Sequence, residues 1–482
     1  MSYRHGVYVS EVPTSIVPPV STSAGLPVVF GTAPVHLALE PVGTNKPVLC
    51  YTYNEAVKQF GYHKDWGKYT LCEFIKSHFA LFNVAPVVFV NVLDPETHKK
   101  AVANKIVTLQ GGKGVIESSE VIMKSLGVKK SDNTVLKAGM DYHAAYNEDG
   151  YVVISRINGG GITEDSASLT VSYNEVDPSL VDSDNIVGGI DWRTGKLEGL
   201  ELVNSVFPYF RLVPGLIVAP GWSQDPTVAA VMAAKADNIN GHFKALALTD
   251  IPTDVVKKYN DVPNWKNQNN YMSNRQVACW PKVKLGDDIY HLSTQAAGVL
   301  CSTDADNDDV PYVSPSNHNL QANGAVLADG TEVFLDNQQA NYLNGEGVVT
   351  ALNFIGGWKL WGNRTAVYPS NTDPKDAFIA VRRMFDWQAN TFILTYWQKV
   401  DAPVNRRLIE TVVDSENIRL NGLAAREFIL GGRVEFQKDE NPLTDLMGGI
   451  IKFHTYITPP APAREIDNII EYDPKYLQTL FE

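Results

Sequence analysis

The chain has few cysteines, and none of them is arranged as a disulfide or metal-binding pair. Its 482 residues include four, Cys50, Cys72, Cys279 and Cys301, which lie far apart with no C-x-x-C motif. This spacing argues against both a disulfide framework and a zinc knuckle. We therefore expect a protein that assembles in a reducing compartment.

Long hydrophobic runs are also absent. The longest, such as NVAPVVFVNVL at 83–93, falls well short of the roughly 20 apolar residues that span a bilayer. Ser10 and Glu11 interrupt any apolar core of a secretory signal after Arg4. The formal net charge of -13 argues against broad nucleic-acid binding. These features predict a soluble protein with no membrane insertion and no direct contact with nucleic acid.

Sequence motifs for catalysis, cofactors and metals are incomplete. LQGGKG at 109–114 lacks the first glycine and the Ser or Thr of a phosphate loop, and INGGGI at 157–162 leads into another strand, so both predict turns. DADNDD at 304–309 lacks the glycine and glutamate of a calcium loop and predicts an acidic surface loop. The ten histidines include no H-E-x-x-H motif. We assign no catalytic, cofactor-binding or metal-binding residue.

The hydrophobic pattern predicts an α+β multidomain fold. Residues 24–93 alternate buried β-branched runs with short helices, which is typical of an α/β sheet covered on both faces. Short alternating strands then predict a β-sandwich or barrel inserted into this central α/β domain. Two long helices, one from Asp373 with Pro374 in its first turn and one closed by Asn421-Gly422, predict an α+β C-terminal domain. The predicted divisions are an N-terminal arm 1–22, central domain 23–95 and 201–372, inserted domain 96–200, C-terminal domain 373–463 and C-terminal arm 464–482.

Both ends of the chain carry a strand-like stretch with no partner nearby. In GVYVSEV (6–12), Val7 and Val9 alternate with Tyr8, and Val12 follows. Prolines at 13, 18 and 19 then exclude a hairpin, because proline removes the donor that a ladder needs. REIDNIIEYD, after the PPAPA spacer, repeats this arrangement. Each strand therefore needs a distant partner.

Five motifs in order resemble one known family. They are MSYRHGVYVSEV, IVGGIDWRTGKLEGLELV, VPGLIVAPGW, GWKLWGNRTA and the ending from GRVEFQ to IIEYD. Together they resemble the tail sheath proteins of contractile-tailed phages and of phage-tail-like particles such as R-type bacteriocins. The resemblance covers essentially the full length of the chain.

The resemblance implies a structural subunit without catalysis or cofactor. Such subunits stack as hexameric rings around an inner tail tube, contract to drive the tube through a cell envelope, and meet baseplate and tail terminator proteins. The implied location is a virion tail or phage-tail-like particle assembled in the bacterial cytoplasm. Family arms add strands to neighbouring subunits. The residues implied for strand exchange are Val7, Tyr8, Val9, Val12, Ile466, Ile469, Ile470 and Tyr472.

The resemblance also implies a C-terminal domain that faces the tube through a modest electrostatic contact. The basic pairs of the two C-terminal helices are the candidates for this contact: Arg406, Arg407, Arg382 and Arg383. Surface ion pairs are individually weak and screened by salt, which suits a contact that must be released.

Two other classes of function stay open from the residues alone. An enzyme would use VAPGWSQDP (218–226), which leaves a strand and enters a helix where α/β proteins bind ligands. Asp225 and Pro226 more simply predict a helix N-cap and a first-turn proline. A glycan-binding surface module would use the β-rich insert at 96–200.

Overall fold

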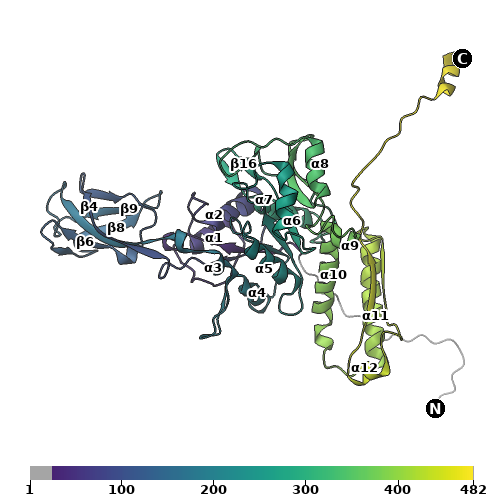
Figure 1. Cartoon of the computed structure of the whole chain (residues 1–482). Helices are drawn as coiled ribbons and strands as arrows, with labels where there is room; N and C mark the ends of the chain where they lie inside the picture. Colours follow the sequence, from purple (N-terminus) through teal and green to yellow (C-terminus); the bar gives the residue numbers. More distant parts are fainter. Residues whose placement is uncertain (1–23, 481–482) are drawn as a thin grey trace, which may run out of the picture.

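An eight-stranded mixed sheet forms the middle of the molecule in the computed structural model, which describes residues 24–480 (Figure 1). The strand order is β2-β3-β1-β13-β14-β15-β19-β20, and only the edge strands β2 and β20 are antiparallel to their neighbours. The strands are β1 (Pro27–Gly31), β2 (Val48–Cys50), β3 (Val87–Asn91), β13 (Leu216–Val218), β14 (Leu246–Asp250), β15 (Gln276–Cys279), β19 (Val348–Asn353) and β20 (Trp358–Trp361).

Successive residues of each central strand enter cores on opposite faces of this sheet. Val29 faces one core, whereas Val28 and Phe30 face the other. The first face is covered by α1 (Tyr53–Phe60), α2 (Thr70–Ile75), a π-helical turn (Lys76–Leu81) and α7 (Leu292–Ala305). The second is covered by α3 (Ser183–Val187), α4 (Val203–Phe210) and α5 (Pro226–Asp237). Because both faces of the sheet are buried, the sequences of these strands are continuous apolar runs.

A third core lies beside β15 and β19. It includes residues of α6 (Val262–Gln268) and α8 (Asn337–Gly345). A small antiparallel sheet, β17-β16-β18, follows β15 and consists of β16 (Lys282–Leu285), β17 (Asp288–Tyr290) and β18 (Gly324–Val326). Shorter 3-10 segments connect the elements: Val35–Leu37, Met123–Ser125, Pro178–Leu180, Gly199–Leu202, Tyr259–Asp261, Trp397–Lys399 and Pro474–Leu480.

A β-rich body projects from one end of the molecule (Figure 1). One sheet contains β4 (Lys99–Thr108), β10 (Ser168–Val176), β6 (Gly127–Lys130) and β7 (Val135–Leu136); the other contains β5 (Lys113–Ile116), β9 (Val152–Arg156) and β8 (Tyr142–Tyr146). Both sheets contribute to a separate core. Val176, Val181 and Ile186 pack in the central core instead, so the last part of the predicted insert 96–200 lies against the central body.

The C-terminal body contains two long helices and a two-stranded sheet at the opposite end (Figure 1). Its elements are α9 (Pro374–Ala377), α10 (Ile379–Tyr396), α11 (Arg406–Ala425), β21 (Gly431–Glu435), α12 (Leu443–Met447) and β22 (His454–Thr458). The single helix predicted from Asp373 is wrong in detail, because Phe378 is extended and its neighbours bond to residues 363–365. The second helix continues past Gly422, where its end was predicted, because Leu420 and Leu423 on its last turns are buried.

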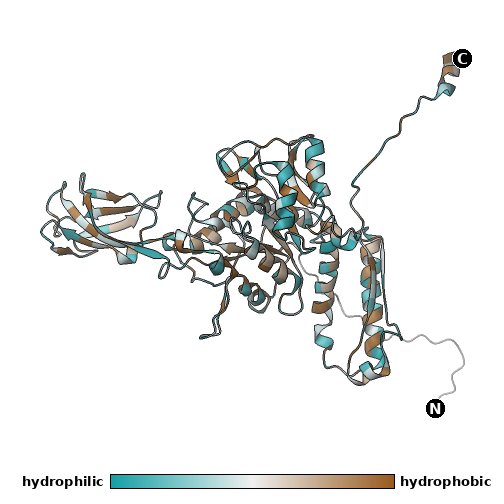
Figure 2. Cartoon of the chain, viewed as in Figure 1, coloured by the Kyte–Doolittle hydropathy of each residue, from teal (hydrophilic) through white to brown (hydrophobic). Residues whose placement is uncertain are grey.

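The mixed α/β, multi-sheet class predicted from the sequence is confirmed by these elements. The division into domains at the predicted boundaries stays a prediction. Colouring by hydropathy shows the apolar residues concentrated inside the three bodies, while brown residues also follow the extended C-terminal segment (Figure 2).

One buried histidine in the first core has no polar partner. His78 in the π-helical turn is 1% exposed, and its ring stacks on Phe74 with centroids 4.9 Å apart. Neither ring nitrogen has a hydrogen-bond partner within residues 24–480. Burial lowers the pKa of His78 to about 3. The imidazole is therefore neutral in the folded chain throughout the neutral pH range.

We predict that His78 makes the fold sensitive to acid. Unfolded chains protonate this imidazole near pH 6.5, whereas the folded chain does not until about pH 3, so stability falls as pH falls through this window. The loss between pH 7 and pH 5 should be about 2 kcal/mol. Urea unfolding at both pH values should show a smaller loss for His78→Leu than for the unchanged chain; equal losses would contradict the assignment.

Candidate assembly surfaces

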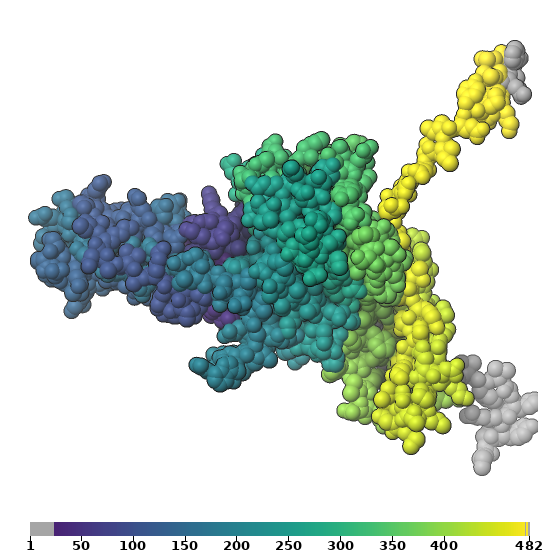
Figure 3. Space-filling view, in the orientation of Figure 1, coloured from purple at the N-terminus to yellow at the C-terminus, as the bar shows by residue number. Residues whose placement is uncertain are grey.

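The C-terminal segment leaves the body as an exposed chain with large apolar side chains. After β22 ends at Thr458, residues 459–473 form no strand or helix, and they extend away from the rest of the molecule (Figures 1 and 3). The four residues predicted for strand exchange here are all highly exposed: Ile466 (88%), Ile469 (93%), Ile470 (86%) and Tyr472 (74%). Burying one such side chain is worth about 1.5–3 kcal/mol. This segment therefore carries apolar area that the rest of the described chain leaves uncovered.

The N-terminal residues predicted for strand exchange lie outside the described residues. They are Val7, Tyr8, Val9 and Val12.

The two-stranded sheet of the C-terminal body has two unlike edges. Strand β21 pairs with β22 from Gly431↔Thr458 to Glu435↔His454. On the side of β21 away from β22, the Asn417 side chain of α11 bonds both the N–H and the carbonyl of Val434, at 2.8 and 3.0 Å. Among residues 24–480, no strand pairs with the outer edge of β22. The outer edge of β22 is therefore the one that can accept an added strand.

Arg382 and Arg383 do not belong to an exposed basic surface. Both are buried, at 7% and 3% exposure. Arg383 donates to Asp304 Oδ1 at 2.9 Å and to the carbonyl of Ala24 at 3.0 Å, and Arg382 donates to Asp376 and Asp386, both at 3.0 Å. Their predicted role in tube contact is wrong for this structure, because neither guanidinium can reach an external surface.

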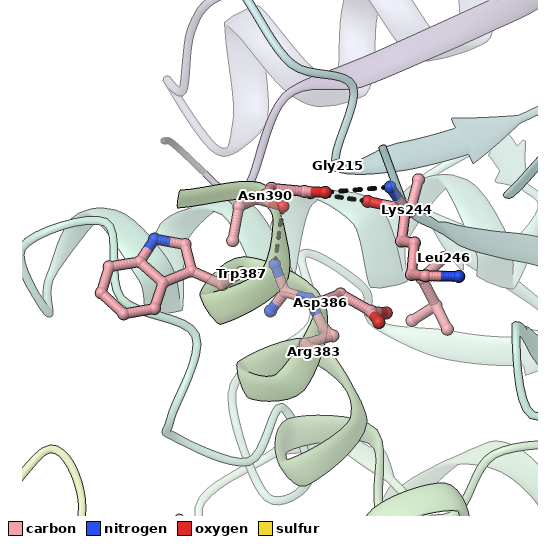
Figure 4. Close-up of a pocket in the computed structure, with 9 residues that line it drawn as sticks. Gly215, Lys244, Leu246, Arg383, Asp386, Trp387 and Asn390 are labelled. Carbon is pink, nitrogen blue, oxygen red and sulfur yellow. Dashed lines mark hydrogen bonds between the residues drawn. The ribbon is translucent and has the colours of Figure 1, made fainter. Parts of the chain in front are cut away.

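Arg383 and Asn390 attach helix α10 to the central body (Figure 4), whereas Arg382 joins α9 to α10 within the C-terminal body. Arg275, which precedes β15, also pairs with Asp386, and Asn390 exchanges two hydrogen bonds with the backbone of Lys244 at 3.0 and 2.8 Å. Burial disfavours the charge on Arg383, but Asp304 outweighs burial and raises the pKa of this guanidinium. Asp304, predicted in an acidic surface loop, is therefore a buried ion-pair partner at the end of α7.

Arg406 and Arg407 are exposed at the start of α11, as a contact surface requires. The Arg406 side chain is 90% exposed and bonds Glu410 Oε1 at 2.6 Å. The Arg407 side chain has no ion-pair partner within residues 24–480. Nearby along the chain, Trp397, Val400 and Val404 are also exposed.

The carboxyl edge of the central sheet, where an α/β enzyme would bind its ligand, is filled by the chain itself. Asp250 at the end of β14 accepts from the Ser293 hydroxyl and backbone N–H, at 2.5 and 3.0 Å. Glu73 pairs with the Nδ1 atom of His291 at 2.7 Å. Burial would raise the pKa of Glu73, but His291 outweighs it and lowers this pKa. This edge is packed by buried side chains and is not an open site.

The predicted enzyme segment 218–226 has a structural role instead. Asp225 caps α5, since its Oδ1 atom accepts from the N–H of Thr227 at 2.8 Å, and Ser183 donates to its other oxygen at 2.6 Å. The N-cap and first-turn proline predicted for Asp225 and Pro226 are confirmed.

Two cavities of the described chain lie in or beside the central body, away from the two glycine-rich loops. Both cavities lie at the edge of the sheet where the parallel strands begin. The smaller, of about 10 Å³, is lined by residues that include Gly215 and Ala245, and the larger, of about 170 Å³, by residues that include Gly25 and Pro86. The loops at 109–114 and 157–162 are turns, as predicted. Across the described chain, no group of three or more His, Cys, Asp or Glu residues could hold a metal ion, and no helix is long and apolar enough to cross a membrane.

A solved structure with the same fold comes from a contractile sheath. The sheath complex of an extracellular contractile injection system, PVC, in its contracted state aligns over 99% of both chains, with a TM-score of 0.58 and 14% sequence identity. The fold is therefore that of a contractile sheath subunit.

Relatives at the sequence level carry the same description. A tail sheath protein of Burkholderia phage BcepMu is 28% identical over 491 aligned residues, which cover 99% of this chain and 98% of the relative. A protein described as a prophage major tail sheath protein of Pseudomonas aeruginosa UCBPP-PA14 is 24% identical over 62% of this chain and 74% of its own. No protein-family model matches.

These matches confirm the resemblance to contractile tail sheath proteins. The chain is therefore similar, over nearly its whole length, to a phage tail sheath protein, and it has the fold of a contractile sheath protein.

We predict that Arg383 contributes strongly to stability because it compensates a buried carboxylate. Arg383→Met should lower the free energy of unfolding by about 3–5 kcal/mol, since Asp304 then stays buried without its partner. Replacing both residues, by Arg383→Met with Asp304→Leu, should recover most of the lost free energy of unfolding. Arg406→Met, at an exposed pair, should cost less than about 1 kcal/mol in the same denaturant titration. A loss at Arg383 no larger than at Arg406 would contradict the role of the buried pair.

Proposed function

We propose that the chain polymerises as stacked hexameric rings around an inner tail tube and contracts to drive that tube through a cell envelope. The observation that carries this proposal is the exposed C-terminal segment, which places four large apolar side chains on an extended chain beyond the body. A monomeric protein gains nothing from such a segment, whereas a lattice can use it as a donated strand.

The C-terminal body supplies a matching acceptor. Strand β22 has an outer edge without a paired strand in the described chain, while Asn417 blocks the edge of β21. A donated strand that forms four or five backbone hydrogen bonds gains only a few kcal/mol, at about 0.5–1.5 kcal/mol each. Two tethered arms per subunit, the N-terminal one including Val7, Tyr8, Val9 and Val12, would add avidity. Rings could then stay connected while their larger surfaces separate.

The tube contact we propose uses Arg406 and Arg407. Both are exposed at one end of α11, and the exposure of Arg406 limits its ion pairs to about 0–1 kcal/mol each. Baseplate and tail terminator proteins would meet the two ends of such a sheath. The particle would assemble in the bacterial cytoplasm.

Electron microscopy of the purified full-length protein tests the proposal directly. A sheath subunit should polymerise into hollow tubes whose width is larger than that of a tube-filled extended sheath. Discrete small oligomers at all protein concentrations would overturn the proposal. Discrete oligomers are also what an α/β enzyme or a glycan-binding module would give.

We predict that the C-terminal arm is needed for polymerisation and not for folding. Ile469→Asp with Ile470→Asp should abolish tubes while the circular dichroism spectrum and unfolding transition stay unchanged, because both side chains are about nine-tenths exposed. Deletion of residues 1–14 should have the same effect. Leu39→Asp, at a side chain 79% exposed on the central body, is the matched control and should still assemble.

We also predict that reversing the charge at the start of α11 weakens tube-templated assembly. Arg406→Glu with Arg407→Glu should raise the tube-protein concentration needed for sheath growth by about tenfold, and added salt should reduce the difference. Lys124→Glu with Lys129→Glu makes the same change of charge on the β-rich body and should leave templating unchanged. If both double variants needed the same tube-protein concentration for sheath growth, the proposal that Arg406 and Arg407 contact the tube would be wrong.

A further inference from the structure

A small hairpin projects from the central body and belongs to none of the surfaces above. It contains β11 (Gly189–Ile190) and β12 (Leu197–Glu198), which pair antiparallel and are joined by residues 191–196. In space-filling view it is the narrow projection on the lower side of the central body (Figure 3).

The root of the hairpin is built for close contact of two backbone segments. Gly188 and Gly199 both have left-handed backbone angles, with φ of 60° and 55°. A side chain on Gly188 would lie 2.0 Å from the carbonyl oxygen of Glu198, and one on Gly199 would lie 2.4 Å from that of Ile186. Gly199 also donates to Asn45 Oδ1 at 3.1 Å. These contacts fix the direction in which the hairpin leaves the body.

The tip is ordered by a single aspartate. Asp191 donates its N–H to the carbonyl of Lys196 at 2.8 Å, and its carboxylate accepts from the Arg193 N–H and the Thr194 hydroxyl at 2.9 and 2.6 Å. This turn presents Trp192, which is 83% exposed, with the Arg193 guanidinium 4.8 Å from its ring centroid. Ile190 beside it is 63% exposed.

Such a tip has the properties of a binding anchor. Tryptophan and arginine are the residues most enriched among those that dominate protein interfaces. A turn that is already ordered loses little conformational entropy on binding, and an exposed indole gains by being buried. Leu197 of β12 packs against the second core, whereas Ile190 and Trp192 contribute to none of the three cores.

We propose that the β11–β12 hairpin inserts into a second copy of this chain. This inference rests on the proposed function, because in a sheath the central body is surrounded by other copies, whereas the tube is met by the C-terminal body. Asn45, which holds the hairpin root, lies three residues before β2 at one edge of the large sheet. The acceptor we infer is at the opposite edge, near β20.

That opposite edge offers apolar and acidic groups together. The loop between β19 and β20 exposes Phe354 (68%) and Ile355 (75%), which suit an indole and an isoleucine. Residues 286–357 contain no Lys or Arg. Asp336 and Glu346 flank α8, which packs against β19, and these carboxylates suit Arg193 and Lys196. A contact between unlike surfaces of identical chains repeats into rings or helical filaments.

Photo-crosslinking from the hairpin identifies the occupant. All four native cysteines are buried, so Glu198→Cys, on β12, provides an exposed thiol for a benzophenone maleimide while the contacts that order the tip stay in place. In assembled tubes, irradiation should join two copies of the chain, and mass spectrometry should map the second site to residues 286–357. Ile106→Cys, 71% exposed on the β-rich body, is the matched labelling control and should not give that product.

A second variant measures the contribution of the indole. Trp192→Ala should raise the concentration needed for polymerisation by at least about tenfold, and Ile106→Ala should leave it unchanged. Tubes that form normally with Trp192→Ala, or crosslinks only within one chain or to another region, would overturn the inference. If the unchanged chain forms no tubes at all, the proposed function fails instead, so the two failures are distinguishable.

Discussion

The buried ion pairs between helix α10 and the central body are the interaction on which the arrangement of this chain depends. Arg383 of α10 pairs with Asp304 at the end of α7, and Asp386 of α10 pairs with Arg275 beside β15. A buried charge without its partner costs several kcal/mol, so any sliding or rotation of α10 would be penalised strongly. Because α10 leads into the rest of the C-terminal body, these pairs fix the orientation of that body, its sheet edge and the C-terminal arm.

The surfaces offered to partners have the opposite physical character. Arg406 and the arm residues Ile469 and Ile470 are exposed, and the outer edge of β22 has no paired strand within residues 24–480. Each such contact contributes at most a few kcal/mol. Strong buried pairs inside the chain and weak contacts outside it suit the contractile lattice that we propose, in which copies would move relative to one another without changing shape. The difference between buried and exposed arginines on neighbouring helices therefore separates internal rigidity from reversible assembly.

The sequence predicted those features that depend on local pattern. Strand β3 could be predicted because both of its faces are buried, so its sequence is a continuous apolar run. The start of α5 could be predicted from the N-cap Asp225 and the first-turn Pro226. Tertiary contacts determined the rest. Phe378 interrupts a good helical pattern because residues 363–365 pair with the backbone around it, and no helix propensity records that contact. Two adjacent arginines look the same in the sequence whether they are solvated or buried. The burial of Arg383 could not be predicted because its partner Asp304 lies 79 residues away along the chain. The β11–β12 hairpin, with two residues per strand, is too short for periodicity to reveal.

The β-rich body shows why a large insertion need not disturb this design. Its entry and exit lie side by side, because Lys99 at the start of β4 pairs with Val176 at the end of β10, and the N–H of Asp177 bonds the carbonyl of His98. When the two ends of an insertion lie at adjacent points, a long insertion costs little more free energy than a short one. The loss of chain entropy on closing the loop grows only with the logarithm of the loop length. The body also has its own core, none of whose residues is shared with the central cores. Its surface can therefore change without altering the ion pairs around α10, and the parts of the chain that we propose for assembly are independent of it.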